Sequence, residues 1–190
     1  MTPRISPIDV ASAPPDVLAL LEPPKAKGSN GTNWFATAIR NTGLYAAWRP
    51  LAKYLNSSDQ LTLRERELIV LRTAWLCQSE YEWGQHVLVA RNGGLTDSEI
   101  ERIRTSPDDE EWTTVERALL RLPAEFAADA RVDPATWAEL AARYDEAQLL
   151  ELLLLVGHYF MIAFALSSID VERESGVPGL DWTPSEDEED

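Results

Sequence analysis

The chain has 190 residues, of which 45% are apolar, and a formal net charge of −15 at pH 7. This length and apolar content predict one compact domain and exclude an intrinsically disordered chain. A surface this acidic repels nucleic acid and anionic membranes, so we expect neither as a partner. Cys77 is the single cysteine and allows no internal disulfide. Because no signal-peptide pattern opens the sequence, we expect a cytoplasmic protein.

The first part of the chain predicts an N-terminal arm. Residues 1–33 are rich in Pro, Ser and Gly, which interrupt regular structure. One short helix is expected over residues 15–21, because Pro15 suits the first turn of a helix. Residues 25–33 predict a loop. We therefore expect the arm to lie over the body of the protein or over a neighbouring subunit.

Two helical patterns follow the arm. They cover residues 34–39 and 44–55, with an Asn-Thr-Gly interruption between them. Pro50 falls inside the second pattern and is expected either to kink that helix or to begin a new one. Residues 56–59 have the sequence Asn-Ser-Ser-Asp, which predicts a loop.

The segment from Leu61 to Leu95 predicts the helix pair around which the chain is organised. Thr62 is suited to cap the first helix, with Glu65 three residues later as its capping-box partner. The second helix begins near Ser79. It ends at residues 92–94, where the sequence Asn-Gly-Gly is typical of left-handed C-cap positions.

Three further helices complete the pattern before the chain's longest apolar run. The first covers residues 97–104 and is capped by Thr96, and the second covers 112–129 with Pro123 inside. The third begins at Pro134, directly after a capping aspartate. We expect the inner face of this third helix to carry Trp137, Leu140 and Ala141.

The last predicted helix, residues 146–171, contains that run. The uncharged stretch from Leu152 to Leu166 is shorter than the roughly 20 residues that a bilayer requires. We therefore predict a helix buried on all sides, inside the domain or at a subunit interface. Residues 175–190 form an acidic C-terminal tail, with a turn or two before a disordered end. The fold class is all-α, a compact helical bundle.

A resemblance to a known family is carried by the run RERELIVLRTAWLCQSEYEWGQHVLVARNGGLTDSEI, and by the later pieces DPATW and LLELLLLVGHY. These are similar to the carboxymuconolactone decarboxylase and alkylhydroperoxidase D-like superfamily. The resemblance implies an alkylhydroperoxidase D-like helical bundle over residues 34–174. It also implies an oligomer whose active sites are lined by the central helix pair.

The resemblance further separates two kinds of chemistry. The alkylhydroperoxidase branch has a glutamate, a Cys-x-x-Cys pair and a histidine, which align here with Glu67, Ser79, Glu82 and His86. Both cysteines are therefore replaced, and a two-thiol redox cycle has no attacking or resolving sulfur. The decarboxylase-like branch carries the Glu-Tyr-Glu-Trp segment found at residues 80–83. The resemblance therefore implies cofactor-free acid–base catalysis.

The predicted catalytic group is His86, assisted by two carboxylates. Glu82 lies four residues before His86, so both share a helix face, and Glu82 is expected to orient the imidazole and raise its basicity. Glu67 supplies a second carboxylate that relays a proton. In a decarboxylation, His86 would protonate the enolate left by loss of CO₂. The expected substrate-binding residues are Tyr81, Trp83, Arg72 and Tyr159.

Several alternatives stay open on the sequence alone. Glu82 and His86 also fit a surface pair without function. Cys77 could serve a peroxidase-like oxidoreductase with an external thiol, or be a small buried residue. The whole chain could be a non-catalytic helical assembly or binding protein.

Metal binding is a rival that we rank low. Glu67, Glu82, His86, Glu151 and His158 offer suitable ligands, but the Glu-x-x-His spacing of di-iron bundles is missing. We predict no metal and no cofactor, and we interpret His158 as a hydrogen-bonded core residue. The expected partners are a small lactone or keto acid and further copies of the chain.

Overall fold

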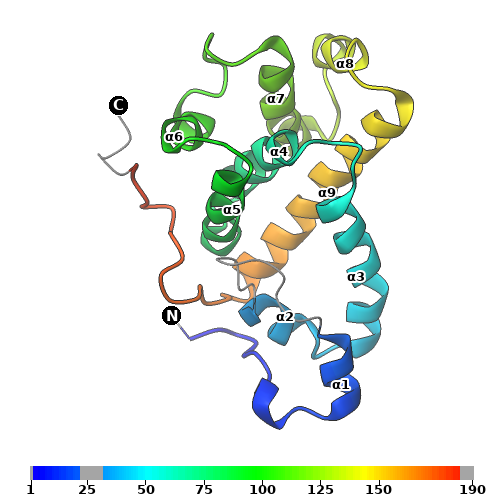
Figure 1. Ribbon diagram of the computed structural model, residues 1–190, viewed down its shortest axis with the longest axis vertical. Helices are drawn as coiled ribbons and strands as arrows, with labels where there is room; N and C mark the ends of the chain where they lie inside the picture. The colour runs from blue at the N-terminus through cyan, green and yellow to red at the C-terminus, as the bar shows by residue number, and fades with distance from the viewer. Residues whose placement is uncertain (1, 22–31, 185–190) are drawn as a thin grey trace.

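The computed structural model describes residues 2–21 and 32–184, and within these ranges all regular structure is helical. The all-α prediction is therefore confirmed. The loop predicted at residues 25–33 lies mostly outside the described residues, as does the acidic end from residue 185 onward. Figure 1 shows the order of the helices along the chain. They are a short 3₁₀ turn, η1 (Val10–Ser12), and the α-helices α1 (Pro15–Leu20), α2 (Thr32–Ala38), α3 (Thr42–Ser57), α4 (Leu63–Leu76), α5 (Glu80–Asn92), α6 (Asp97–Thr105), α7 (Thr114–Asp129), α8 (Pro134–Ala141) and α9 (Glu146–Ser168).

Helix α4 is the centre of the bundle. It contacts α5, α6, α7 and α9, and Leu68, Ile69, Val70 and Leu71 on four successive positions are fully buried. A helix that is apolar on every side at its middle must be enclosed by neighbours. Its start is fixed by the predicted capping box, in which Thr62 accepts from the Glu65 backbone and Glu65 accepts from the Thr62 backbone.

Most predicted helix boundaries lie within two residues of those observed. Thr96 and Asp133 cap α6 and α8 as expected. Of the two glycines after α5, only Gly94 has a left-handed backbone, with φ of 83°, whereas Gly93 has φ of −82°. Helix α3 runs two residues further than predicted, to Ser57, and so shortens the loop.

Two prolines lie inside helices without interrupting them. Pro50 is in α3 and Pro123 is in α7, and each helix continues for at least six residues beyond its proline. A proline removes one backbone donor and crowds the carbonyl four residues earlier. Pro50 and Ala46 are both solvent-exposed, so water can satisfy the carbonyl that loses its partner. The prediction of a new helix beginning at Pro50 is therefore wrong.

The last helix is not buried on all sides within the single chain, so the first of its two predicted settings, the interior of the domain, is wrong, and burial at a subunit interface stays a prediction. Helix α9 ends at Ser168 and has one inner and one outer face, with Phe164 on the outer face 75% exposed. By length and composition alone α9 could cross a membrane, yet 56% of its most apolar 18-residue window is buried against the rest of the chain. A core helix has the same signature. On α8, Leu140 is buried as predicted, but Trp137 and Ala141 are exposed, because that short helix packs mainly against α7 and α9.

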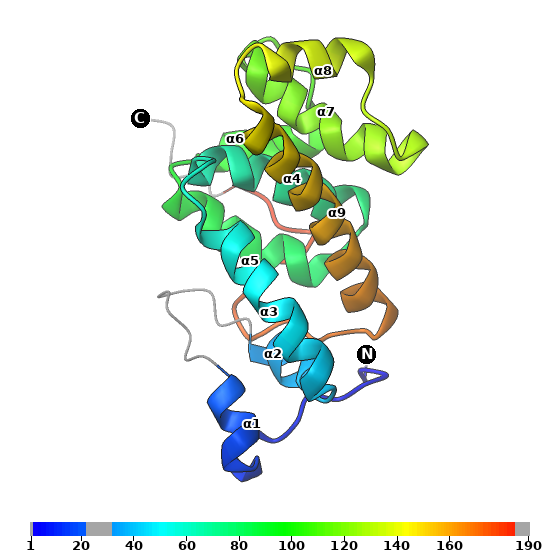
Figure 2. The same cartoon turned by 90° about the vertical axis from the view of Figure 1, so that its right-hand side faces the viewer.

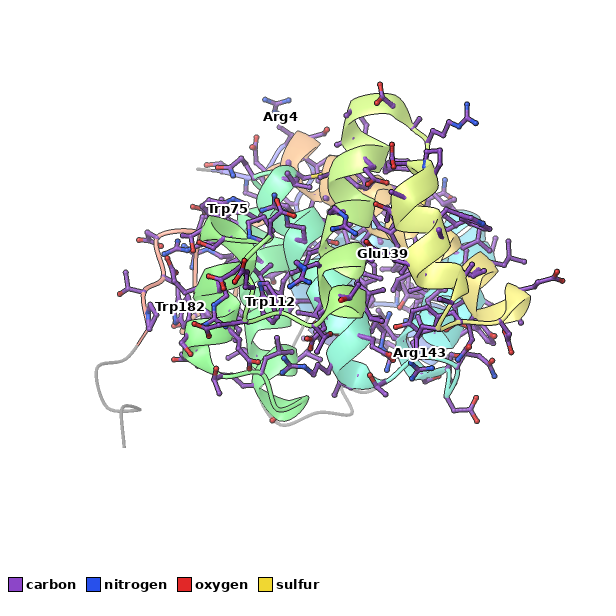
Figure 3. The ribbon with its side chains drawn as sticks, turned by 90° about the horizontal axis from the view of Figure 1, so that it is seen from above. Arg4, Trp75, Trp112, Glu139, Arg143 and Trp182 are labelled. Carbon is purple, nitrogen blue, oxygen red and sulfur yellow. The ribbon has the colours of Figure 1, made fainter. Side chains whose placement is uncertain are left out.

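The C-terminal segment, residues 171–184, lies along α5. Gly84 of α5 meets it so closely that a Cβ there would stand 2.0 Å from the carbonyl oxygen of Pro178. Only glycine permits this contact between two backbones. Further along, the guanidinium of Arg91 lies 5.5 Å from the Trp182 ring, and Figure 3 shows Trp182 beside the green ribbon of α5 and α6. The segment is thus a second layer over one side of the central helix pair.

Candidate active site

The centre of the candidate site is a hydrogen bond between α4 and α5. His86 Nδ1 lies 2.7 Å from Glu67 Oε2, and the two side chains are 15% and 1% exposed. Because a carboxylate accepts hydrogen bonds, this geometry favours the imidazole with its hydrogen on Nδ1. In that form Nε2 is the nitrogen that can exchange a proton.

The connection between α4 and α5 makes this pairing possible. Gln78 has a left-handed backbone, with φ of 51°, and it turns the chain between the end of α4 and the start of α5. The two helices then pack against each other, so Glu67 and His86 meet although they are far apart in sequence. The predicted role of Glu82 as the partner of His86 is wrong, because Glu67 makes the hydrogen bond.

Glu82 is the second buried carboxyl group of the same site. Its side chain is 2% exposed, and neither carboxyl oxygen has a hydrogen-bond partner among residues 2–21 and 32–184. Burial, and then the negative charge of Glu67, raise the pKa of Glu82 well above its usual range. Both effects favour the protonated, uncharged form of Glu82.

Tyr159 of α9 packs against His86. Its ring lies 5.1 Å from the His86 ring, with the two planes at 89°. Its hydroxyl donates a 2.8 Å hydrogen bond to Asn56 Oδ1 of α3. Burial, and then the negative charge of Glu67, raise the pKa of Tyr159 well above its usual range, so the phenol keeps its proton. Tyr159 is thus placed as predicted, and Asn56, which the sequence pattern did not single out, orients it.

A second imidazole adjoins this ring pair. His158 stacks on Trp48 of α3, with ring centroids 6.0 Å apart and planes at 7°. Its Nδ1 is buried without a hydrogen-bond partner in the described part of the chain, contrary to our expectation of a hydrogen-bonded core residue. Burial, and then the charge on His86, lower the pKa of His158 to about 4. His158 is neutral at physiological pH.

Tyr81 lies away from His86 and contacts the C-terminal segment. Its hydroxyl donates to Glu174 Oε1 over 2.9 Å and accepts from the Trp34 backbone over 3.2 Å. The ring packs with Ile162 and Leu166. The prediction that Tyr81 lines the substrate site is not supported by this geometry, because five residues along a helix turn its side chain to another face.

Trp83 and Arg72 also have structural surroundings. Trp83 is fully buried in the main core, 5.7 Å from the Trp75 ring. The Arg72 guanidinium donates to the carbonyl oxygens of Ile103 and Arg104, at the end of α6. A cation there satisfies carbonyls that have no partner within their own helix. Arg72 therefore holds α6 to α4, and its charge is engaged away from His86.

The position of Cys77 argues against thiol chemistry. The residue is the C-cap of α4, and burial raises its pKa to about 11. The reactive form of cysteine is the thiolate, which is scarce at pH 7 for such a group. Ser79, at the first cysteine position of the alkylhydroperoxidase branch, is 1% exposed, and its hydroxyl has no partner among the described residues.

Neither of two surface depressions contains His86. One of about 410 Å³ lies between the N-terminal arm and the end of α2, and one of about 700 Å³ lies between the start of α5 and the C-terminal segment. We therefore define the candidate site by the Glu67–His86 hydrogen bond and the buried carboxyl groups, and not by these depressions. Within residues 2–21 and 32–184, no three His, Cys, Asp or Glu side chains gather as metal ligands would.

The comparisons with known proteins concern the family and the fold. The carboxymuconolactone decarboxylase family model matches residues 42–125, which span α3 to α6 and most of α7, and include Glu67, Glu82 and His86. None of the curated proteins matches the sequence.

Solved structures with the same fold have low sequence identity. An alkylhydroperoxidase AhpD core protein from Ralstonia eutropha JMP134, described as an uncharacterized peroxidase-related protein, superposes with a TM-score of 0.74 at 17% identity, covering 90% of this chain and 93% of that chain. The debrominase Bmp8 superposes with a TM-score of 0.73 at 17% identity, covering 90% and 92%. A peroxidase-related protein from Silicibacter sp. TM1040 gives 0.67 at 15% identity, covering 82% and 92%.

At these identities the structural matches establish the fold, which is the AhpD-like helical fold. The sequence match to the carboxymuconolactone decarboxylase family covers residues 42–125. Both agree with the resemblance carried by the central run and by the later helical pieces.

Proposed function

We propose that this chain is a cofactor-free acid–base enzyme that decarboxylates or isomerises a small lactone or keto acid. The observation that carries the proposal is the buried hydrogen bond between Glu67 and His86. A histidine held by a buried carboxylate is suited to accept and return a proton near neutral pH. The family match over residues 42–125 supports this class of chemistry.

In the proposed decarboxylation, the bond between the substrate carboxylate and its neighbouring carbon breaks and CO₂ leaves. The electron pair of that bond passes into the adjacent carbonyl group and gives an enolate. His86, in its protonated form, donates the Nε2 proton to the carbon of the enolate. The imidazole then regains a proton from solvent, so one proton is consumed for each CO₂ released. In an isomerisation His86 removes and returns a proton.

The two carboxyl groups have separate roles in this scheme. Glu67 holds the imidazole and stabilises its positive charge. Burial favours the neutral form of Glu82, which would add no second negative charge where an anionic substrate must approach. The Tyr159 ring packs perpendicular to the imidazole and would limit access of water. The proposed partner is a small-molecule substrate, and the proposed location is the cytoplasm.

The test is proton exchange and CO₂ release. A panel of β-keto acids and carboxylated lactones is incubated in D₂O with the wild type, and proton NMR follows loss of the exchanging C–H signal. His86→Gln keeps a hydrogen-bonding side chain but removes the titratable nitrogen. Tyr81→Phe is the matched control, since Tyr81 contacts the C-terminal segment instead of His86. Equal turnover in wild type and His86→Gln would contradict the proposal.

A measurement without substrate tests the same geometry. Nitrogen-15 NMR of the imidazole side chains distinguishes the two neutral tautomers. We expect His86 to carry its hydrogen on Nδ1 and to lose that preference in Glu67→Gln, because the carboxylate is what stabilises it. A wild-type His86 with its hydrogen on Nε2 would show that the assigned roles of the two nitrogens are reversed.

A further inference from the structure

A line of exposed apolar residues runs along the outer face of α9. Leu150, Leu154, Met161 and Phe164 are 58%, 53%, 50% and 75% exposed, and Gly157 lies between the second and third of them. We name these five residues the α9 stripe. Their spacings of four, three, four and three residues follow a seven-residue repeat. Such a repeat keeps one seam of a helix facing a partner helix along its whole length.

Helix α3 extends this apolar surface. It contacts α9, and Figure 2 shows the two helices side by side on the side of the molecule that faces the viewer. On α3, Leu44, Leu51 and Tyr54 are 64%, 45% and 54% exposed, and the two leucines are one seven-residue repeat apart. A stable interface buries about 800 Å² on each partner, which is more than one helix seam provides. The two helices together offer a wider face.

Charge decides what can cover this face. Residues 152–168 of α9 include no Asp, Glu, Lys or Arg, and the charges of the two helices cancel, with Arg49 and Lys53 on α3 and Glu146 and Glu151 on α9. The whole chain carries −15, so two copies repel each other through most of their surfaces. The α3–α9 face is where copies of this acidic chain can approach without that repulsion.

We propose that the α9 stripe is the seam of a two-fold symmetric homodimer in which α9 packs antiparallel to α9 of a second copy. The stripe is close to symmetric about its central residue, so a two-fold axis near Gly157 places Gly157 against its own equivalent. Phe164 then meets Leu150 of the partner subunit, and Met161 meets Leu154 of the partner subunit. A C2 interface requires this self-complementarity.

In the proposed dimer, Gly157 would let the two α9 helices approach closely where they cross. A Cβ built at this position meets no atom within 4 Å in the single chain, so the chain's own packing gives no reason for glycine here. Glycine in the middle of a helix is unfavourable compared with alanine. At the crossing point of two helices, the missing side chain lets the backbones approach and lets the larger neighbours interlock.

The proposed dimer would also support the candidate site, although it does not rest on the proposed function. The inner face of α9 supplies His158 and Tyr159, and α3 supplies Trp48 and Asn56. A second copy packed on the outer faces of these two helices would hold both pairs of residues in register. The candidate site and the proposed seam therefore lie on opposite faces of the same two helices.

Multi-angle light scattering on the full chain at micromolar concentration tests the proposal. We expect the wild type at twice the 21.3 kDa chain mass, and Gly157→Leu shifted towards a single chain mass. Gly157→Leu is the sharp variant, because the added side chain enters open space in the monomer and replaces a poor helix former. Leu154→Glu places a charge in the seam and should have the same effect. The matched control is Trp137→Glu, an exposed apolar residue on α8, which should leave the mass unchanged.

Cross-linking tests the position of the two-fold axis. In a Cys77→Ser background, Gly157→Cys should form a disulfide-linked dimer under mild oxidation, whereas Trp137→Cys should not. A wild type that is monomeric, or an oligomer unaffected by Gly157→Leu, would overturn the proposal. Binding of the monomeric wild type to phosphatidylcholine vesicles, lost in Leu154→Glu, would assign the stripe to a membrane surface and also overturn it.

Discussion

The α4–α5 interface buries groups that proteins usually expose, whereas the outer face of α9 exposes groups that proteins usually bury. At the interface, the carboxyl groups of Glu67 and Glu82 are buried, although such groups are rarely enclosed. On α9, Leu150 and Phe164 are exposed, although such groups are usually enclosed. Each arrangement costs free energy in the isolated chain. Local departures of this kind are expected where a protein binds or reacts.

The two regions also differ in how their departure is resolved within one chain. At the interface, Glu67 has His86 as a partner and the raised pKa of Glu82 favours its uncharged form, so the chain itself compensates part of the cost. On α9, nothing in the described part of the chain covers the stripe. The comparison suggests that the first region is complete in a single chain, whereas the second needs a second molecule.

The largest expected effect concerns His86. Replacement by Gln should reduce turnover of a responsive substrate by about 100-fold or more, because a general acid–base group contributes roughly that much. The fold should persist, since Gln can still bond to Glu67, and circular dichroism with a melting curve checks this. Loss of turnover together with loss of the folded state would mean that the region is structural and would remove the distinction drawn above.

A second test concerns Glu82, at the buried α4–α5 interface. Because its pKa is raised in the folded state, the fold is favoured while Glu82 is protonated, and this advantage declines as pH rises from the unfolded pKa, roughly 4.3, towards the folded pKa. Glu82→Gln is neutral at every pH. We therefore expect the variant to be more stable than the wild type by a few kcal/mol at pH 8, with the difference shrinking towards pH 4. Urea unfolding at several pH values measures it.

The control for this test is Glu80→Gln on the same helix. Glu80 is exposed, so its replacement should change stability little at any pH. An identical pH dependence for Glu82→Gln and wild type would show that Glu82 is ionised in the folded protein. The candidate site would then hold two buried negative charges, and the comparison of a compensated region with an uncompensated one would fail.

A smaller effect is expected for His158, on the inner face of α9. Its folded pKa of about 4 lies below the ordinary 6.5, so the unfolded chain takes up a proton first as pH falls. Wild-type stability should fall between pH 6.5 and pH 4 by a contribution on the order of 1–2 kcal/mol, allowing for partial solvent screening. His158→Gln should lose less stability over this window, and Glu146→Gln on the exposed start of α9 serves as control. Equal acid sensitivity of His158→Gln and wild type would contradict the lowered pKa.

The smallest effect is expected for Cys77. Replacement by Ser should change stability by less than about 1 kcal/mol, since the residue is only half buried at the end of α4. Turnover of any substrate should be unaffected, because the thiol is protonated at pH 7 and has no second cysteine. Hydroperoxide reduction by the wild type that disappears in Cys77→Ser would instead place thiol chemistry in this region.

Local chemistry allowed most of the fold to be predicted. Capping boxes at Thr62 and Thr96, and the Asp-Pro start of α8, act over three or four residues and can be seen in the sequence. The position of Trp137 could not be predicted this way. A spacing shows which residues share a face, but the direction of that face depends on which helices surround it.

The sequence grouped Glu67, Glu82 and His86 correctly, but it did not predict their hydrogen bonding, and Tyr81, Trp83 and Arg72 lie in other surroundings. The spacing of Glu82 and His86 correctly placed both at one interface, yet it could not show that Glu67 would reach His86 first. That hydrogen bond joins two helices, and its geometry depends on the left-handed turn at Gln78. Asn56 carried no motif at all, since its role appears only when α3 lies beside Tyr159.

The contact between Gly84 and Pro178 has a consequence for inheritance. Because the two backbones touch, the docked arrangement admits no side chain at position 84. Any missense change at that codon must displace the C-terminal segment and with it the hydrogen bonds from Tyr81 and Gln85 to Glu174. A single missense mutation at codon 84 would therefore have the same effect on the protein as a truncation near the C-terminus, namely loss of the docked C-terminal segment.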